Sequence, residues 1–151
     1  MRLTARLILI VSLLVLTQSF QAALAPQPNI GVNGYFSNDK AQRGRTIQAA
    51  IVIDIPSGYH VNANPASSKD LIPTALTFDG YDLKQLIYPK PHRFKPKFAE
   101  EAIEVYQGTE RIVALFPNGS LKPDTRLRGT LSAQACTEEI CLPPAELPFS
   151  N

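Results

Sequence analysis

The chain has 151 residues, of which 44% are apolar, and its 15 basic and 13 acidic side chains give a net charge of +2. Two of the basic residues, Arg2 and Arg6, lie in an N-terminal segment with the features of a secretory signal, so the rest of the chain is close to neutral. A near-neutral chain argues against nucleic acid or an acidic membrane surface as a partner.

The N-terminal segment, residues 1–25, is predicted to be a signal peptide. Two arginines flank the start of an almost unbroken apolar run from Leu7 to Leu16, and Ala-Leu-Ala at 23–25 fits the small-x-small pattern of a cleavage site. The run is too short to span a bilayer comfortably. Pro26 fits poorly after a cleavage site, and an uncleaved amphipathic anchor is the alternative. We expect one exported domain at 26–151, with no membrane span in the mature chain.

Thirteen prolines and eight glycines divide the chain into short pieces, in which apolar residues alternate instead of following a helical period. In the segment 46–55 the apolar side chains fall on one face, which predicts a half-buried strand. Residues 103–106 and 111–116 are expected to pair around a turn at 107–109. The segment 89–99 is predicted to be a long irregular loop, of the kind that often carries function. Further strands are predicted at 59–64, 74–78, 83–88, 126–135 and 146–149.

These roughly eight or nine short strands, separated by turn residues, predict an all-β protein with an immunoglobulin-like β-sandwich fold. The cysteine–tryptophan–cysteine signature of antibody domains is absent, because the chain contains no tryptophan. After the signal peptide about 125 residues remain, which is enough for a single domain around one core.

Cys136 and Cys141 are the only cysteines, and four residues separate them. In an oxidising compartment such a pair is expected to form a disulfide. A closed loop of about six residues stabilises a fold by only roughly 2 kcal/mol, about half of what a loop near a hundred residues would give. The short spacing therefore favours a working redox couple over a structural bridge, although an inert hairpin disulfide is the alternative.

Five short motifs in chain order point to a known family. They are Gly-Tyr-His-Val-Asn at 58–62, Leu-Ile-Pro-Thr at 71–74, Tyr-Pro at 88–89, Gln-Ala-Cys at 134–136 and Cys-Leu-Pro-Pro at 141–144. With them the chain resembles the N-terminal periplasmic domain of the thiol:disulfide interchange protein DsbD, also called the disulfide bond corrector domain. The resemblance implies an immunoglobulin-like fold and a periplasmic shuttle that passes electrons from a membrane or thioredoxin-like reductase to thioredoxin-fold thiol proteins. The transmembrane and C-terminal thioredoxin-like domains of DsbD have no counterpart in this sequence, so the resemblance leaves its electron source open.

The same resemblance assigns roles to individual residues of a thiol:disulfide oxidoreductase that needs no cofactor. Cys141 would form the mixed disulfide with a partner, and Cys136 would resolve it. His60 lies in a segment that runs near the cysteine loop in the family, where it could stabilise a thiolate or relay a proton, or serve only as a structural histidine. Asn62 falls on the same side if the segment is extended. Phe98 would be the aromatic tip that covers the disulfide, or an ordinary loop aromatic.

Two acids, Glu138 and Glu139, lie between the cysteines. Negative charge raises the pKa of a nearby thiol, so these acids argue against a strongly activated thiolate. They could also be solvated turn residues.

Two other functions compete with redox exchange. The sandwich could be a binding module whose disulfide is only structural. The two cysteines with His60 and His92 could also bind a metal, although the spacing is looser than in usual zinc sites. Outside such a site, His92 is expected to be a solvated bystander.

Overall fold

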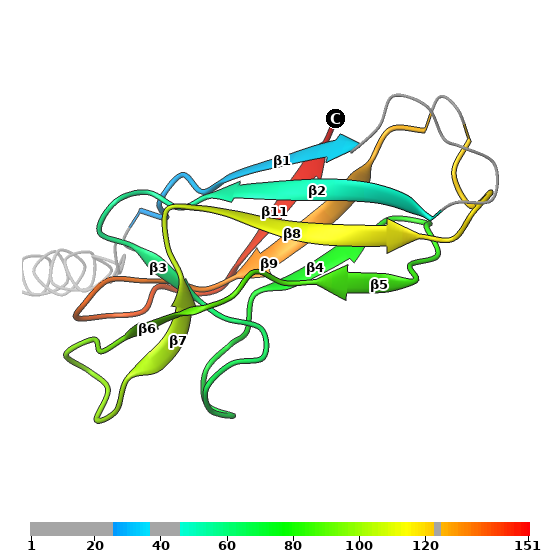
Figure 1. Ribbon diagram of the computed structural model, residues 1–151. Helices are drawn as coiled ribbons and strands as arrows, with labels where there is room; N and C mark the ends of the chain where they lie inside the picture. Colours follow the sequence, from blue (N-terminus) through cyan, green and yellow to red (C-terminus); the bar gives the residue numbers. More distant parts are fainter. Residues whose placement is uncertain (1–25, 37–45, 123–124) are drawn as a thin grey trace, which may run out of the picture.

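The computed structural model describes residues 26–36, 46–122 and 125–151, and the predicted signal peptide at 1–25 lies outside them. Within these ranges the chain forms eleven β-strands and no helix (Figure 1). The described residues therefore include no helix that could cross a membrane. The strands are β1 (Gly31–Phe36), β2 (Ile47–Asp54), β3 (His60–Asn62), β4 (Ala75–Phe78), β5 (Gln85–Ile87), β6 (His92–Phe94), β7 (Ile103–Tyr106), β8 (Thr109–Phe116), β9 (Arg128–Ala133), β10 (Ala135–Cys136) and β11 (Ala145–Ser150).

The strands pair in three antiparallel sheets, with the orders β1-β2-β8-β5, β10-β3-β7-β6 and β11-β9-β4. Only Gln134 separates β9 from β10, so the second and third of these sheets are almost continuous. In Figure 1, β9 and β11 pass behind the first sheet, and β3, β6 and β7 lie together at one end of the molecule. The predicted immunoglobulin-like β-sandwich is confirmed.

Strand β2 shows why the sequence folds this way. Ala49, Ile51 and Ile53 are buried and alternate with partly exposed residues, as the period of two predicted. Ile51 lies directly opposite Ile112 of β8, and both side chains are fully buried. Cross-strand pairs of β-branched residues are a main source of sheet stability. This pair therefore stabilises the centre of the sheet β1-β2-β8-β5.

Three phenylalanines join the two layers of the sandwich. The ring of Phe78 on β4 meets Phe116 on β8 edge-on, with 5.2 Å between centroids, and Phe149 on β11 at 5.8 Å. Edge-to-face contacts suit the charge distribution of aromatic rings. Gly129 lies opposite both Phe78 and Phe149 in register, and a Cβ there would collide with the carbonyl of Thr77.

Some sequence predictions differ from the structure. Segments 103–106 and 111–116 do not pair with each other, because β7 joins the sheet of β3 and β6 whereas β8 pairs with β2 and β5. The chain changes sheets at Gly108, whose φ of 65° suits glycine. The predicted loop 89–99 contains the short strand β6, and the predicted strand 126–135 is divided into β9 and β10. Strand β1 was not predicted.

Candidate functional site

The two cysteines form a disulfide at the end of the molecule where β10 meets β3. Their Cα atoms are 4.0 Å apart. In the turn between them, the Thr137 N–H donates to the carbonyl of Ile140 at 2.8 Å, and the Thr137 hydroxyl accepts the N–H groups of Glu139 and Ile140, each at 3.2 Å. After the turn, the Leu142 N–H donates to the carbonyl of Ala135 at 2.8 Å. The turn therefore satisfies its own backbone and holds the two sulfurs together.

The two cysteine residues differ in exposure to solvent. Cys136 is fully buried at 0% exposure, whereas Cys141 is partly exposed. A thiolate that approaches from solvent can therefore reach Cys141 more readily than Cys136. The greater exposure of Cys141 agrees with the implied role of this cysteine, which is to form the mixed disulfide with a partner.

His60 lies next to the buried sulfur. It is the cross-strand partner of Cys136 in the pairing of β3 with β10, and such partners project their side chains to the same face of a sheet. The His60 side chain is buried at 1% exposure, and its Nε2 atom has no hydrogen-bond partner. Burial lowers the pKa of His60, because desolvation disfavours the charged ring. The family resemblance implied that His60 lies near the cysteine loop, and the structure places it opposite Cys136.

Asn62 lies two residues further along β3 and is also fully buried. Its Nδ2 donates to the carbonyl of Ile72 at 3.0 Å, and its backbone carbonyl accepts the hydroxyl of Thr74 at 2.7 Å. Its Oδ1 has no partner. Nearby, the hydroxyl of Tyr106 accepts the N–H of Asn64 at 3.1 Å, and burial raises the pKa of Tyr106. Asn62 therefore fixes the chain beside the site and leaves one acceptor free.

Two aromatic side chains cover His60. The ring of Phe94 on β6 lies 4.8 Å from the His60 ring, and Phe98, in the loop after β6, stacks on it at 6.5 Å. Phe98 is 41% exposed, whereas Phe94 is partly buried. The resemblance implied that Phe98 covers the disulfide, and that role stays a prediction. The structure places the ring of Phe98 against His60 and adds Phe94, which lies closer to His60.

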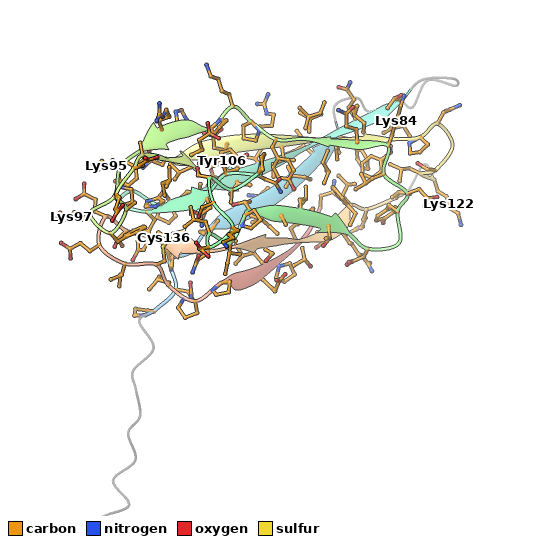
Figure 2. All side chains as sticks on the ribbon, turned by 90° about the horizontal axis from the view of Figure 1, so that it is seen from below. Lys84, Lys95, Lys97, Tyr106, Lys122 and Cys136 are labelled. Atoms are coloured by element: carbon orange, nitrogen blue, oxygen red, sulfur yellow. A yellow bond between two sulfur atoms is a disulfide. The ribbon has the colours of Figure 1, made fainter. Side chains whose placement is uncertain are left out.

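Lys97 connects this aromatic cover to the cysteine turn. Its N–H donates to the carbonyl of Glu138 at 2.7 Å, and its Nζ lies 2.9 Å from Oε1 of Glu139 and 3.7 Å from Oε2 of Glu138. Figure 2 shows Lys95 and Lys97 at the same end as Cys136, with Lys84 and Lys122 at the opposite end. No sequence pattern singled out Lys97, although the loop that contains it and the acidic turn are both evident in the sequence.

The second histidine has a different environment. His92 is exposed, and its Nε2 lies 3.0 Å from Oε1 of Glu110. In the part of the chain that the structure describes, no group of three or more histidine, cysteine or acidic side chains could hold a metal ion. Both cysteines are bonded to each other, so neither sulfur is a free thiolate that could bind a metal ion in this form.

The chain is similar to known proteins in its sequence pattern and in its fold. The sequence pattern of the family described as thiol:disulfide interchange protein DsbD, N-terminal, matches residues 33–150. The fold is similar to the N-terminal domain of Neisseria meningitidis DsbD in the reduced form, with a TM-score of 0.56 and 17% identity over 89% of this chain and 93% of that one. It is also similar to the N-terminal periplasmic domain of ScsB from Proteus mirabilis, with a TM-score of 0.52 and 14% identity over 84% of this chain and 49% of that one. No curated protein matches the chain in sequence.

The fold and the site together define an immunoglobulin-like domain with a short-loop disulfide, in which the cross-strand partner of Cys136, His60, is covered by two phenylalanine rings. The family match extends over most of the chain and includes every motif on which the predicted resemblance rests. The protein therefore belongs to the family of DsbD N-terminal domains, which supports its assignment as a thiol:disulfide exchange module.

Proposed function

We propose that this protein is a periplasmic module in which the couple of Cys136 and Cys141 passes electrons from a membrane or thioredoxin-like reductase to periplasmic thiol proteins. The observation that carries the proposal is the asymmetry of the disulfide, which joins a buried cysteine to a partly exposed one across a turn of four residues. A bridge in so short a loop adds little stability, whereas an exposed sulfur with a buried partner suits stepwise exchange.

Exchange would begin at the exposed sulfur. The thiolate of a reduced thioredoxin-fold protein attacks Sγ of Cys141, a disulfide forms between the two proteins, and the bond to Cys136 breaks with its electron pair on Sγ of Cys136. The second thiolate of the partner then displaces Cys141 from the mixed disulfide. The partner leaves oxidised, and both cysteines of this protein are reduced. Delivery to an oxidised thiol protein is the same sequence in reverse, with Cys141 as the attacking thiolate.

The aromatic cover would limit which thiols reach the couple. Phe98 and Phe94 lie over His60, which is itself opposite Cys136. A protein partner that docks at this end could displace the exposed Phe98 and Lys97, whereas a stray small thiol gains no docking energy to do so. The proposed role of Phe98 is thus to protect the couple between encounters, and that of Asn62 is to hold the shape of the pocket.

Trapping of a mixed disulfide tests this function. The probe is a bacterial thioredoxin whose second active-site cysteine is replaced by serine, so that its attack stops at the mixed disulfide. With the oxidised protein, we expect a covalent complex whose linked peptide contains Cys141, and with the double variant Cys136→Ala, Cys141→Ala we expect none. Linkage mainly through Cys136 would reverse the assignment of the sulfurs. If no complex forms, the disulfide is structural and the binding-module alternative is favoured.

A further inference from the structure

Two buried polar atoms beside the disulfide have no hydrogen-bond partner, Nε2 of His60 and Oδ1 of Asn62. Buried polar groups in folded proteins almost always have partners, so an exception near reacting atoms calls for an explanation. Both residues lie on β3 two positions apart, which places them on the same face of the strand. No group of the described residues therefore satisfies Nε2 of His60 while the disulfide is formed.

Reduction of the disulfide supplies such a group. A disulfide sulfur has no hydrogen to donate and accepts hydrogen bonds only weakly, whereas a thiolate is a strong acceptor. Cys136 is the cross-strand partner of His60, so its sulfur emerges on the face to which the imidazole projects. The same exchange that breaks the disulfide thus creates an acceptor on the face of the sheet to which His60 projects.

We propose that His60 is a catalytic residue of this site, whose Nε2–H donates a hydrogen bond to the Cys136 thiolate as that sulfur leaves. The inference rests on the proposed function and adds a chemical role within it. The partner thiolate forms its bond with Cys141, the bond to Cys136 breaks, and the electron pair stays on Cys136. The ring of His60 remains neutral and transfers no proton, so no further reactant is needed. Solvent later supplies the proton that converts the Cys136 thiolate to a thiol.

Among the side chains around Cys136 that are named below, His60 is the buried hydrogen-bond donor that this thiolate could use. The backbone oxygen of Gln134, 4.0 Å from Sγ of Cys136, is an acceptor and cannot stabilise a negative sulfur. Phe94 and Phe98 cover the ring of His60 and exclude water from this side. The titratable side chain of Tyr106 on β7 is bonded to the backbone of Asn64. The charged residues on the elements around the ring are all at least partly exposed: Arg93, Lys95, Lys97, Glu104, Glu138 and Glu139.

Exchange kinetics provide the first test. The oxidised protein is mixed with dithiothreitol under pseudo-first-order conditions, and free thiols are counted by alkylation and mass spectrometry. His60→Leu should slow the opening of the disulfide about ten-fold, because a leaving thiolate without its hydrogen bond has a higher pKa and leaves more slowly. His60→Gln, whose amide can place an N–H near the position of Nε2, should retain a rate within about three-fold of the original. His92→Leu is the matched control and should change nothing, since His92 is exposed and bonded to Glu110.

A purely structural role for His60 would not affect the acidity of Cys136, and this gives the second test. In a Cys141→Ala background, the ultraviolet absorbance of the Cys136 thiolate is titrated against pH, once with His60 intact and once with the substitution His60→Leu. The substitution should raise the pKa of the Cys136 thiol by about one unit, as expected for the loss of one hydrogen bond to the charged form. An unchanged pKa in the folded variant would overturn the proposal.

A third measurement needs no variant, so the proposal stays testable even if His60→Leu does not fold. The ring signals of His60, followed by NMR as the pH of the reduced protein is raised, should shift as the Cys136 thiol ionises, because Nε2–H then donates to the thiolate. The oxidised protein should show no shift over the same pH range, and an equally flat titration in the reduced protein would count against the proposal. If the original protein exchanges with thiols but all three measurements are unaffected by His60, this inference alone fails. If the original protein does not exchange at all, the proposed function fails with it.

Discussion

The backbone N–H of Lys97 donates a 2.7 Å hydrogen bond to the carbonyl of Glu138, which joins the aromatic cover to the turn that carries the disulfide. The side chain of Lys97 adds ion pairs to Glu139 and Glu138, and the three side chains are 66%, 70% and 63% exposed. Ion pairs this exposed stabilise a contact by about 0–1 kcal/mol. The cover is therefore held by contacts that a docking protein can replace.

Removal of the Lys97 side chain should make the disulfide easier to reach. We expect Lys97→Ala to raise the rate of reduction by dithiothreitol about two- to five-fold at low ionic strength, because the loss of up to about 1 kcal/mol opens the cover more often. Added salt should raise the rate of the original protein toward that of the variant, since salt screens exposed pairs. Lys95→Ala is the control, because Lys95 is exposed at the same end but forms none of the ion pairs in the described chain. Equal rates for the two variants would show that Lys97 does not restrain the cover.

The strands with regular alternation could be predicted from the sequence because local pattern and burial agree in them. Ala49, Ile51 and Ile53 on β2, and Leu131 on β9, are buried as their spacing indicated. Strand β6 could not be predicted, because three residues between prolines carry no detectable period, and its pairing with β7 depends on the tertiary fold. The hairpin expected at 103–116 failed for a similar reason, since a turn at Gly108 is equally compatible with a change of sheet.

The candidate site was predictable in part. The cysteine spacing and the motif around His60 led to the correct end of the molecule, where Cys136 and His60 are cross-strand partners. The contact of Lys97 with Glu139 spans 42 positions, and no local pattern encodes a pair that forms only when two loops meet in space. The proximity of Phe94 to His60 likewise follows from the pairing of β6 with β7, which the sequence did not reveal.

Stability without the disulfide distinguishes a redox couple from a structural bridge. We expect the double variant Cys136→Ala, Cys141→Ala to remain folded and to lose about 2 kcal/mol of unfolding free energy, the value for a loop of about six residues. Urea unfolding followed by circular dichroism measures this loss. A double variant that is unfolded at room temperature would mean that the bridge holds the sandwich together.

The buried His60 predicts how stability depends on pH. The pKa of His60 is lowered in the folded state, so the unfolded chain binds more protons than the folded one. As the pH is lowered below about 6.5, the ordinary pKa of histidine, the free energy of unfolding therefore decreases. Above that pH the contribution is fully present, and it is lost as pH falls through the folded-state pKa. Urea unfolding between about pH 5 and 8 should show a weaker pH dependence in His60→Gln than in the original protein. Identical pH profiles would indicate that His60 does not titrate differently in the two states.

The core of the sandwich makes a prediction independent of the site. Gly129→Ala should destabilise the fold by about 1–3 kcal/mol, the usual cost of overpacking, because the new Cβ would meet the carbonyl of Thr77 and the ring of Phe149. Gly119→Ala is a useful comparison, since a Cβ at Gly119 meets nothing and only its φ of 77° is unfavourable. If thermal unfolding gives the same small loss for both variants, the packing between β4, β9 and β11 is looser than described.

The reduction potential of the couple of Cys136 and Cys141 tests the central claim most directly. The oxidised protein is equilibrated in buffers with graded ratios of reduced to oxidised dithiothreitol and of reduced to oxidised glutathione, and the fraction of reduced cysteines is measured by alkylation and mass spectrometry. A couple that exchanges electrons with thioredoxin-fold proteins should have a potential above about −300 mV, where the known exchange proteins lie. A potential well below about −300 mV, typical of structural bridges, would contradict the assignment of this disulfide as a working redox site.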